Sequence, residues 1–431
     1  MNRNMETIRC EMTGESCLHV KHESGLEIYI MEMPGYHTAH ALFGTKYGSI
    51  NTRFRLGGEE DYAEVPEGIA HFLEHKLFEN EDCDAFAQYA RTGADANAYT
   101  SFDRTCYLFH CSENFAQSLE ILLSFVQAPY FTAESVAKEQ GIIGQEIQMY
   151  DDEPSWRVFF NLLRGMYHAH PVRIDIAGTI DSIAQIDADL LYRCYNTFYN
   201  LHNMVLSVAG NVNADEVLEI CDRLLKPCEN HGLEQVFPEE PYEIVKDTVY
   251  DNLPTGAPIF NLGFKLRPRS GQELVKAEYL ALMIMQTLLD TSSAFYQEMT
   301  EKGLINSEFS VDAPFSGDGY FAVICGGESR DPEAVRDRIF EVIRDAKENG
   351  FDREAFELIR RTAYGAKIRS GESVEANATK MLGAFMSGLK PFSSMPVLAE
   401  ITYEDALQFL RDEIDTENVT LSVVQNKEQE E

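Results

Sequence analysis

The sequence lacks the features that mark membrane, secreted and nucleic-acid-binding proteins. Within its 431 residues, no apolar run approaches the length of about eighteen residues that a membrane-spanning helix needs. Its first residues show no basic stretch followed by an apolar one, so we expect no secretory signal. We therefore predict that the protein does not insert into a membrane.

Basic residues are scarce. The chain has 36 lysines and arginines against 71 aspartates and glutamates, which gives a formal net charge of -35. Such a chain repels phosphates, so we predict that nucleic acid is not a partner. Two interpretations of the acidic excess stay open. It can line a chamber that attracts basic peptides, or it can serve solubility alone.

Disulfide and zinc-ribbon patterns are also missing. The nine cysteines are scattered, and no C-x-x-C pair occurs. This usage favours reduced thiols, and hence a cytoplasmic protein, over a disulfide framework. The length exceeds what one hydrophobic core supports, so two to four domains are expected.

One stretch of the sequence contains a candidate metal-binding motif. Residues 65–80 read VPEGIAHFLEHKLFEN and contain an H-x-x-E-H motif formed by His71, Glu74 and His75. In a helix, positions i and i+4 share one face, so both imidazoles can point at one metal ion. Glu74 lies beside them, where it can hold a water molecule. The alternative interpretation is a surface helix with incidental histidines.

A catalytic zinc site usually has a third protein ligand and keeps one position open for water. Residues 131–154 predict a long helix with Thr132 as its N-cap. Within it, Glu139 and Glu146 are seven residues apart and therefore lie on one face, two turns from each other. Glu146 is our candidate for the third ligand.

A G-x-A-H-F-L-E-H helix, followed about seventy residues later by a helix with two glutamates seven apart, resembles the insulinase (pitrilysin, M16) family of inverzincin zinc metallopeptidases. The resemblance implies one Zn²⁺ per chain, bound by His71, His75 and Glu146. It implies that Glu74 is the general base and that Glu139 is a supporting catalytic acid near the site. An alternative for Glu139 is that it is an ordinary solvated side chain. An alternative for the metal is that the same ligands hold manganese or cobalt.

The next segment, GADANAYTSFDRTCYLFHC, predicts two strands at about 95–101 and 104–111. In the family, a strand resembling N-A-Y-T-S forms an edge beside the zinc, and the peptide substrate adds to it as another strand. The resemblance therefore implies substrate-binding roles for Asn97, Ala98 and Tyr99. Otherwise Asn97 is an ordinary turn residue.

The pattern of predicted elements indicates an α+β fold with two homologous halves. We expect a metal-binding peptidase domain at 1–226, a linker at 227–245 and a homologous domain without the motif at 246–431. Each half should have a mixed or antiparallel sheet packed with helices. The resemblance implies that the halves form a clamshell around a peptide.

Two details of these halves can be compared with a structure. In the first half, residues 26–32 and 39–48 look like paired strands. In the second half, aligning Phe351 with Phe131 puts Ala366 opposite Glu146. The second half therefore repeats the pattern without the metal chemistry.

The second half also departs from the family. Active relatives carry an arginine and a tyrosine in a segment resembling L-R-E-K-G-L-A-Y, whereas this chain reads MTEKGLIN, with Thr300 and Asn306 at those positions. Three explanations compete: weak activity alone, substitution by other residues, or a partner subunit that supplies the pair. The chain is most similar to the zinc-bearing subunit of paired bacterial members, sometimes labelled as associated with elongation-factor-P modification, although no residue supports that label.

Taken together, the residues and the resemblance predict a zinc-dependent endopeptidase that hydrolyses peptides or unfolded segments. It would work as a heterodimer with a homologous subunit that supplies the arginine and tyrosine, or as a homodimer. The alternative is a structural or assembly subunit that keeps the peptidase fold without turnover. A second histidine pair, His168 and His170, has a spacing more typical of surface or structural histidines than of a metal site.

Overall fold

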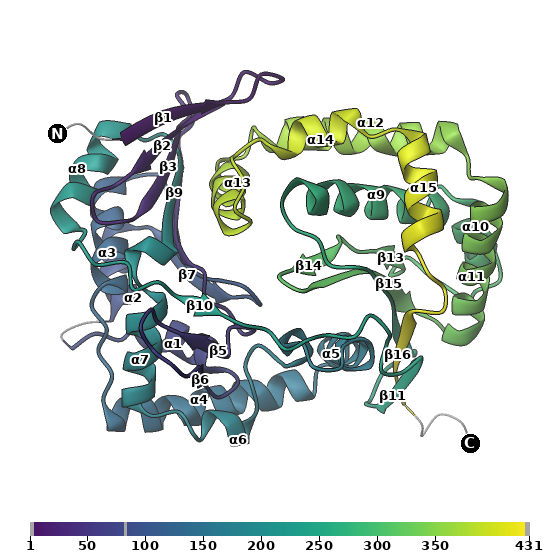
Figure 1. Ribbon diagram of the computed structural model, residues 1–431, viewed down its shortest axis with the longest axis horizontal. Coiled ribbons are helices and arrows are strands. Elements are labelled where there is room, and N and C mark those ends of the chain that lie inside the picture. Colours follow the sequence, from purple (N-terminus) through teal and green to yellow (C-terminus); the bar gives the residue numbers. More distant parts are fainter. Residues whose placement is uncertain (1–3, 82–83, 427–431) are drawn as a thin grey trace. The chain divides into compact units, whose positions relative to one another are not determined.

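The computed structural model describes residues 4–81 and 84–426. They form two compact units, each assembled from separate parts of the chain (Figure 1). Unit 1 contains Met1–Ile147, Asp175–Val236 and Lys367–Ser393, and unit 2 contains Gln148–Ile174, Phe237–Ala366 and Ser394–Glu431.

Unit 1 is built on a seven-stranded sheet with the strand order β1-β2-β3-β9-β4-β8-β7. The strands are β1 (Asn4–Arg9), β2 (Ser16–Lys21), β3 (Glu27–Glu32), β4 (Ala39–Thr45), β7 (Asp95–Thr100), β8 (Thr105–Cys111) and β9 (Met204–Gly210). Its helical segments are α1 (Ile69–Leu77), α2 (Ala85–Thr92), α3 (Phe115–Val126), α4 (Ala133–Asp151), α6 (Ile180–Ile183), α7 (Ala188–Phe198), η2 (Leu201–Asn203), α8 (Ala214–Leu224) and α13 (Val374–Met386). The last residues of α4 lie across the unit boundary.

The prediction that strands 26–32 and 39–48 pair with each other is wrong. Both strands exist, as β3 and β4, but β9 lies between them. β9 is parallel to β3 and antiparallel to β4, and every one of its seven residues is buried. A continuous apolar strand is stabilised most at the centre of a sheet, where both of its faces are covered. It therefore takes the position between the two strands.

Unit 2 has a sheet with the order β11-β16-β12-β15-β13, and β14 also pairs with β15. The strands are β11 (Thr248–Asn252), β12 (Ile259–Lys265), β13 (Ser310–Val311), β14 (Phe315–Gly317), β15 (Tyr320–Glu328) and β16 (Val419–Gln425). The helical segments are α5 (Pro154–Met166), η1 (Pro171–Arg173), α9 (Gly271–Leu289), α10 (Ala294–Glu301), α11 (Pro332–Asn349), α12 (Arg353–Ser370), α14 (Ser394–Glu400) and α15 (Tyr403–Glu413). The last residues of α12 lie across the unit boundary.

The two sheets have the same topology, which confirms the α+β fold with two homologous halves. In each, one strand is antiparallel to both of its neighbours: β4 between β9 and β8, and β12 between β16 and β15. In each, one further strand joins in parallel, β3 to β9 and β11 to β16.

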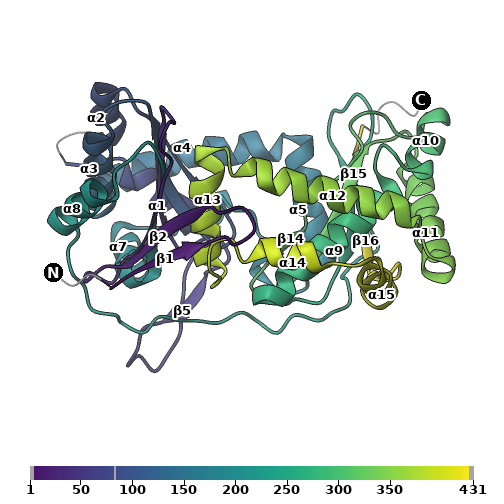
Figure 2. The same cartoon turned by 90° about the horizontal axis from the view of Figure 1, so that it is seen from above.

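A helix distant in sequence from most of its sheet covers one face of each sheet: α13 packs on β9 and β4, and α5 packs on β16 and β12 (Figures 1 and 2). Both approaches depend on a glycine at the same register position. A Cβ on Gly44 would lie 2.9 Å from Met386 Cε, and one on Gly263 would lie 2.7 Å from Met166 Sδ. The repeated glycines keep the helices close to the sheets.

The compact units do not follow the halves along the chain. Residues 148–174 belong to unit 2 and residues 367–393 to unit 1. One crossing between the units, at Val236–Phe237, lies inside the expected linker 227–245. Part of that linker is ordered, because β10 (Glu234–Gln235) joins β5 (Arg53–Arg55) and β6 (Ala63–Glu64) in a small sheet. The division of the chain into 1–226 and 246–431 stays a prediction.

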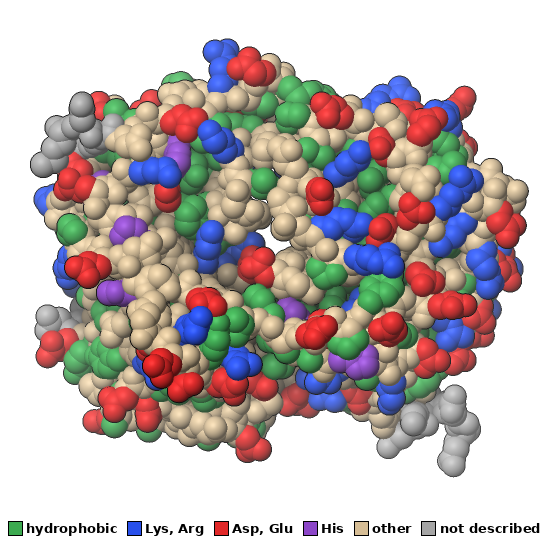
Figure 3. All heavy atoms as spheres, in the orientation of Figure 1, with side chains coloured by type: hydrophobic (Ala, Val, Ile, Leu, Met, Phe, Trp, Pro, Cys, Tyr) green, Lys and Arg blue, Asp and Glu red, His purple; other side chains and the backbone are tan. Residues whose placement is uncertain are grey.

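On the face of the molecule in Figure 3, acidic and basic side chains are interspersed over both units. None of the helices in the described residues combines the length and the apolar composition needed to cross a bilayer.

Candidate metal centre

The H-x-x-E-H motif lies on α1, as the sequence predicted. The helix begins after Gly68, whose φ of 85° favours glycine and whose added Cβ would lie 2.4 Å from the Ala177 carbonyl oxygen. Phe72 and Leu73 are fully buried and fix the rotation of the helix. This rotation turns the face with the two histidines toward α4.

The structure brings together the three predicted ligands. One donor atom from each of His71, His75 and Glu146 lies within 4.8 Å of the others, the only such group of three among the described residues. His71 Nε2 is 3.7 Å from Glu146 Oε1, and His75 Nε2 is 3.5 Å from Glu146 Oε2. These distances exceed those of hydrogen bonds and leave space for an ion between the donors. Two imidazoles and one carboxylate form a donor set that fits zinc.

The protonation of one of the two histidines, His71, also fits a metal site. Burial, together with the neighbouring His75, lowers the pKa of His71 to about 4, so this ring is neutral at physiological pH, as a ligand must be. Its Nδ1 is buried and has no hydrogen-bond partner among the described residues. Burial acts to lower the pKa of His75, but the bond to Glu139 and the neighbouring carboxylates outweigh it and raise that pKa.

Glu139 orients one of the ligands. Its Oε1 lies 3.0 Å from His75 Nδ1, on the ring side opposite the Nε2 that faces Glu146. A carboxylate on the far nitrogen of a metal-binding histidine fixes the ring and its tautomer. Burial would raise the pKa of Glu139, but the hydrogen bond with His75 lowers it below its ordinary value. Glu139 is therefore placed for the supporting role that the resemblance implies.

Glu74 projects from the same helix toward the edge strand β7. The Thr100 hydroxyl donates a hydrogen bond of 2.6 Å to Glu74 Oε2. Burial raises the pKa of the Glu74 carboxyl, and the bond from Thr100 offsets part of this rise. A carboxyl with a raised pKa is better matched to accepting and returning a proton near neutral pH.

The edge strand is where the sequence predicted it, but its side chains divide between two faces. β7 is the terminal strand of the sheet, so one of its backbone edges is unpaired within that sheet. Side chains alternate along a strand, so Ala98 and Thr100 lie on the face of Glu74 and Tyr99 on the opposite face. Tyr99 is paired in register with Cys106, and burial, with a smaller contribution from Cys106, raises the pKa of Tyr99.

Sequence reasoning missed Thr100. Strand alternation places Thr100 on the same face as Ala98, but no spacing in the sequence gives its contact with Glu74.

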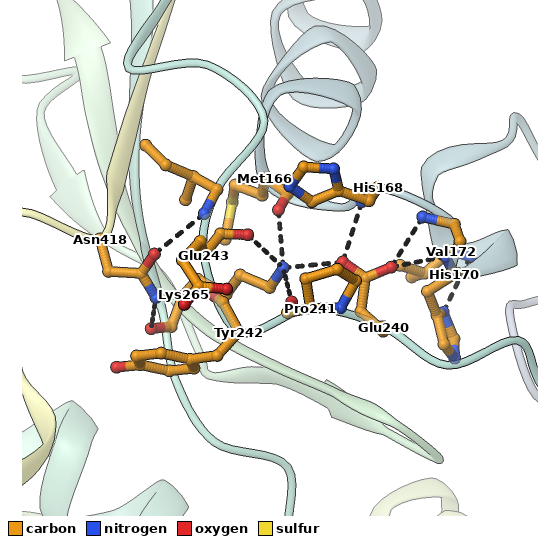
Figure 4. Close-up of polar contacts among 12 residues, drawn as sticks. Met166, His168, His170, Val172, Glu240, Pro241, Tyr242, Glu243, Lys265 and Asn418 are labelled. Atoms are coloured by element: carbon orange, nitrogen blue, oxygen red, sulfur yellow. Dashed lines mark hydrogen bonds and ion pairs between the residues drawn. The ribbon is translucent and has the colours of Figure 1, made fainter.

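The histidines at 168 and 170 do not form a second metal pair (Figure 4). His170 is buried, with Nε2 2.9 Å from the Asp318 carbonyl oxygen and Nδ1 accepting the Val172 N–H at 3.1 Å. Both of its ring nitrogens are thus engaged in the fold. His168 is exposed, and its backbone N–H donates to Glu240.

Glu240 belongs to a buried polar cluster of unit 2 (Figure 4). Its carboxylate accepts hydrogen bonds from the backbone N–H groups of His168, Ala169 and His170, and from Lys265 Nζ at 2.8 Å. Lys265 also donates to backbone carbonyls, including that of Met166 at 2.8 Å. The groups of this cluster satisfy one another, so it holds the fold of unit 2 together.

The departure from the family in the second half is local. Asn306 donates from Nδ2 to Glu328 Oε2 at 2.8 Å, and its carbonyl accepts from the Tyr296 hydroxyl at 3.3 Å. Thr300 is exposed near the end of α10. Neither side chain carries a guanidinium or a phenol.

Comparisons with known proteins point to one family. The family model described as insulinase (peptidase family M16) matches residues 58–180, and the model described as the peptidase M16 inactive domain matches residues 185–363. The uncharacterized zinc protease YmfH of Bacillus subtilis (strain 168) is 38% identical over 433 residues, which cover 97% of this chain and 99% of that protein. The chain therefore belongs to the insulinase (M16) peptidase family.

Two solved structures share the fold. The crystal structure of an M16-like peptidase from Alicyclobacillus acidocaldarius is 33% identical, covers 99% of both chains and superposes with a TM-score of 0.90. A protease from Helicobacter pylori, 19% identical, covers 98% of this chain and 99% of its own with a TM-score of 0.78. At the lower identity the likeness concerns the fold alone.

Proposed function

We propose that this protein is a zinc-dependent endopeptidase that hydrolyses peptides or unfolded segments. The observation that carries the proposal is the convergence of His71, His75 and Glu146, with Glu74 beside them and Glu139 behind His75. The names of the curated relatives, which are called zinc proteases, support the same class of reaction.

The mechanism follows from the positions of these side chains. A bound zinc ion would supply a polarised water molecule with a lowered pKa. With the ion bound, Glu74 would take up the proton of a water molecule that attacks the scissile carbonyl and would return it to the leaving amine. Thr100 holds the Glu74 carboxylate in place through its hydrogen bond. Glu139 keeps the His75 ring oriented.

The free edge of β7 supports a binding mode for the peptide. An extended substrate pairs with the backbone beside Asn97 and Ala98, and its scissile bond comes to lie near Glu74. The side chain of Tyr99, on the other face, supports the strand from behind. Closure of the two halves around the peptide stays a prediction.

A second subunit would complete the site. Thr300 and Asn306 offer no charged donor for the substrate or for the developing oxyanion, and loss of such a donor can cost orders of magnitude in rate. We infer that a homologous partner supplies an arginine and a tyrosine, either in a heterodimer or through a homodimer. No described cysteine forms a disulfide, which supports a reducing cytoplasmic compartment.

The alternative function is that of a non-catalytic assembly subunit. The same absence of the arginine and tyrosine favours it. The complete ligand set argues against it, because a scaffold has no need of three converging donors.

Cleavage of a quenched-fluorescent peptide library tests the proposal. The purified chain is assayed alone and with its homologous partner, each with and without a chelator, and its metal content is measured before metal is added. Chelator-sensitive cleavage supports the peptidase, and a requirement for the partner supports the split site. Bound zinc without cleavage in any arm would favour the assembly subunit, and a different bound metal would correct the cofactor.

A further inference from the structure

We propose that a cavity beside the metal centre is a specificity pocket for a cationic side chain, above all arginine, of a residue that flanks the scissile bond. The inference rests on the proposed peptidase function and names the substrate class for that same site. It lies wholly within unit 1.

The cavity has a volume of about 510 Å³. Glu74 and His75 line it, and so do Asn97 and Ala98 of the edge strand. A peptide paired with β7 whose scissile bond lies at Glu74 would therefore direct a neighbouring side chain into it. The volume is large enough for the longest natural side chains.

Two stacked aromatic rings form one wall. The rings of Phe78 and Phe86 are parallel within 10°, with centroids 4.3 Å apart. Phe78 is 7% exposed, whereas Phe86 is 48% exposed although it is a large apolar residue. An aromatic face that borders a cavity is a binding surface for a guanidinium, which stacks on it through cation–π and dispersion forces.

Carboxylates among the residues that line the cavity favour a positively charged side chain. Glu79 is paired with Lys76, whose side chain is fully buried, so this lysine acts as a positioning residue for Glu79. Asp84 is fixed by accepting the N–H of Phe86 at 2.7 Å. The carboxyl end of α1 adds partial negative charge from its last carbonyls. The opposing cation on the lining is Lys138, which is exposed on α4.

This combination excludes the other classes of side chain. An apolar side chain would cover Phe86 but would strip water from Glu79 and Asp84 without replacing its hydrogen bonds. An acidic side chain would meet two carboxylates. Arginine covers the ring and donates to the carboxylates at the same time, so it is the side chain that the pocket fits best.

The test compares two fluorescent peptides that differ at one position, arginine against its neutral isostere citrulline. Their binding to the zinc-loaded full chain carrying Glu74→Gln is measured by anisotropy, so that affinity is read without turnover. We expect the arginine peptide to bind roughly tenfold more tightly at low salt. The preference should shrink as salt is added, because the rim of the pocket is exposed.

Substitutions of residues that line the cavity test whether these residues cause the preference for arginine. Glu79→Gln with Asp84→Asn should reduce the preference to about twofold or less, since the charges are lost while the oxygens that Lys76 and the Phe86 N–H need are kept. Lys138→Glu, at an exposed position that the fold does not require, should increase it. Glu64→Gln with Glu113→Gln is the matched control, because it removes two exposed charges of unit 1 outside the cavity. It should leave the preference unchanged.

Equal binding of the two peptides, or no binding of either, would overturn the proposal. A preference that survives Glu79→Gln with Asp84→Asn would overturn the assignment to this cavity. The peptidase function is judged separately, by chelator-sensitive cleavage with the unaltered chain. If cleavage is absent but arginine is preferred through these residues, the catalytic proposal fails and the pocket stands. If cleavage occurs without any such preference, the pocket fails alone.

Discussion

The two units of this protein treat buried charge in opposite ways. In unit 1, donor atoms of His71, His75 and Glu146 converge at 3.5 and 3.7 Å, too far apart to hydrogen-bond and near enough to share an ion. In unit 2, Lys265 and Glu240 meet at 2.8 Å, and backbone groups satisfy the rest of their hydrogen-bonding capacity. Charges that converge without satisfying one another indicate a binding site, whereas charges that satisfy one another hold a fold.

The difference arose within one repeated architecture. Five strands follow the same order in both sheets, and the alignment of Phe351 with Phe131 holds in atomic detail. The backbone N–H of each phenylalanine donates to a tyrosine hydroxyl at 3.1 Å, that of Tyr192 in unit 1 and that of Tyr403 in unit 2. The fold therefore does not depend on the metal ligands, because the core packs without them.

The largest effect is expected for Glu74→Gln, which tests whether unit 1 holds a catalytic site. We expect peptide cleavage to fall about 10³-fold while zinc content is unchanged, because an amide cannot accept the water proton and Glu74 is not a ligand. Cleavage rates and metal stoichiometry are measured on the same preparation. Glu67→Gln, just before α1, is the control and should keep full activity. Retained turnover in Glu74→Gln would remove this residue from the role of base.

The contrast predicts that unit 2 is the one that loses stability when a charge is removed. Burial acts to raise the pKa of Glu240, but the bonds from Lys265 and three backbone N–H groups outweigh it and lower the pKa to about 2. A pKa depressed in the folded state contributes stability above the unfolded value and loses it as pH falls toward 2. Glu240→Gln should therefore cost about 3 kcal/mol at neutral pH, with the difference closing between about pH 5 and pH 2.

Hydrogen exchange of the β12 amides as a function of pH measures this effect. Glu308→Gln, an exposed site in the same unit, is the control. A difference that does not depend on pH would show that Glu240 contributes through packing rather than through its charge.

The smallest effect is expected for the residue that orients a metal ligand, Glu139. Glu139→Gln should weaken zinc binding by about 10- to 100-fold, because His75 loses the carboxylate that orients its ring. Competition with a chelating dye gives the affinity. Glu134→Gln, in the first turn of the same helix, should have no such effect. An unchanged affinity in Glu139→Gln would mean that packing alone orients His75.

Much of the site could be predicted because helices impose fixed spacings. The separations of His71 from His75 and of Glu139 from Glu146 place each pair on one face of its helix, and the structure shows both pairs on facing sides of α1 and α4. Thr100 was missed because its contact with Glu74 joins a strand to a helix. No spacing in the sequence encodes that distance. The pocket at Phe86 was missed for the same reason, since its lining residues come from four elements, α1, α2, β7 and α4.

The sequence by itself determined the local geometry: which residues share a helix face, which strands alternate, and where the second half repeats the first without ligands. Only the tertiary structure decided which strands became neighbours. β9 entered between β3 and β4 because a fully buried, largely apolar strand is most stable at the centre of a sheet. It also decided that α5 and α13 would each cover a sheet built mainly from the other half. Periodicity governs contacts within an element, but packing between elements follows from burial summed over the whole chain.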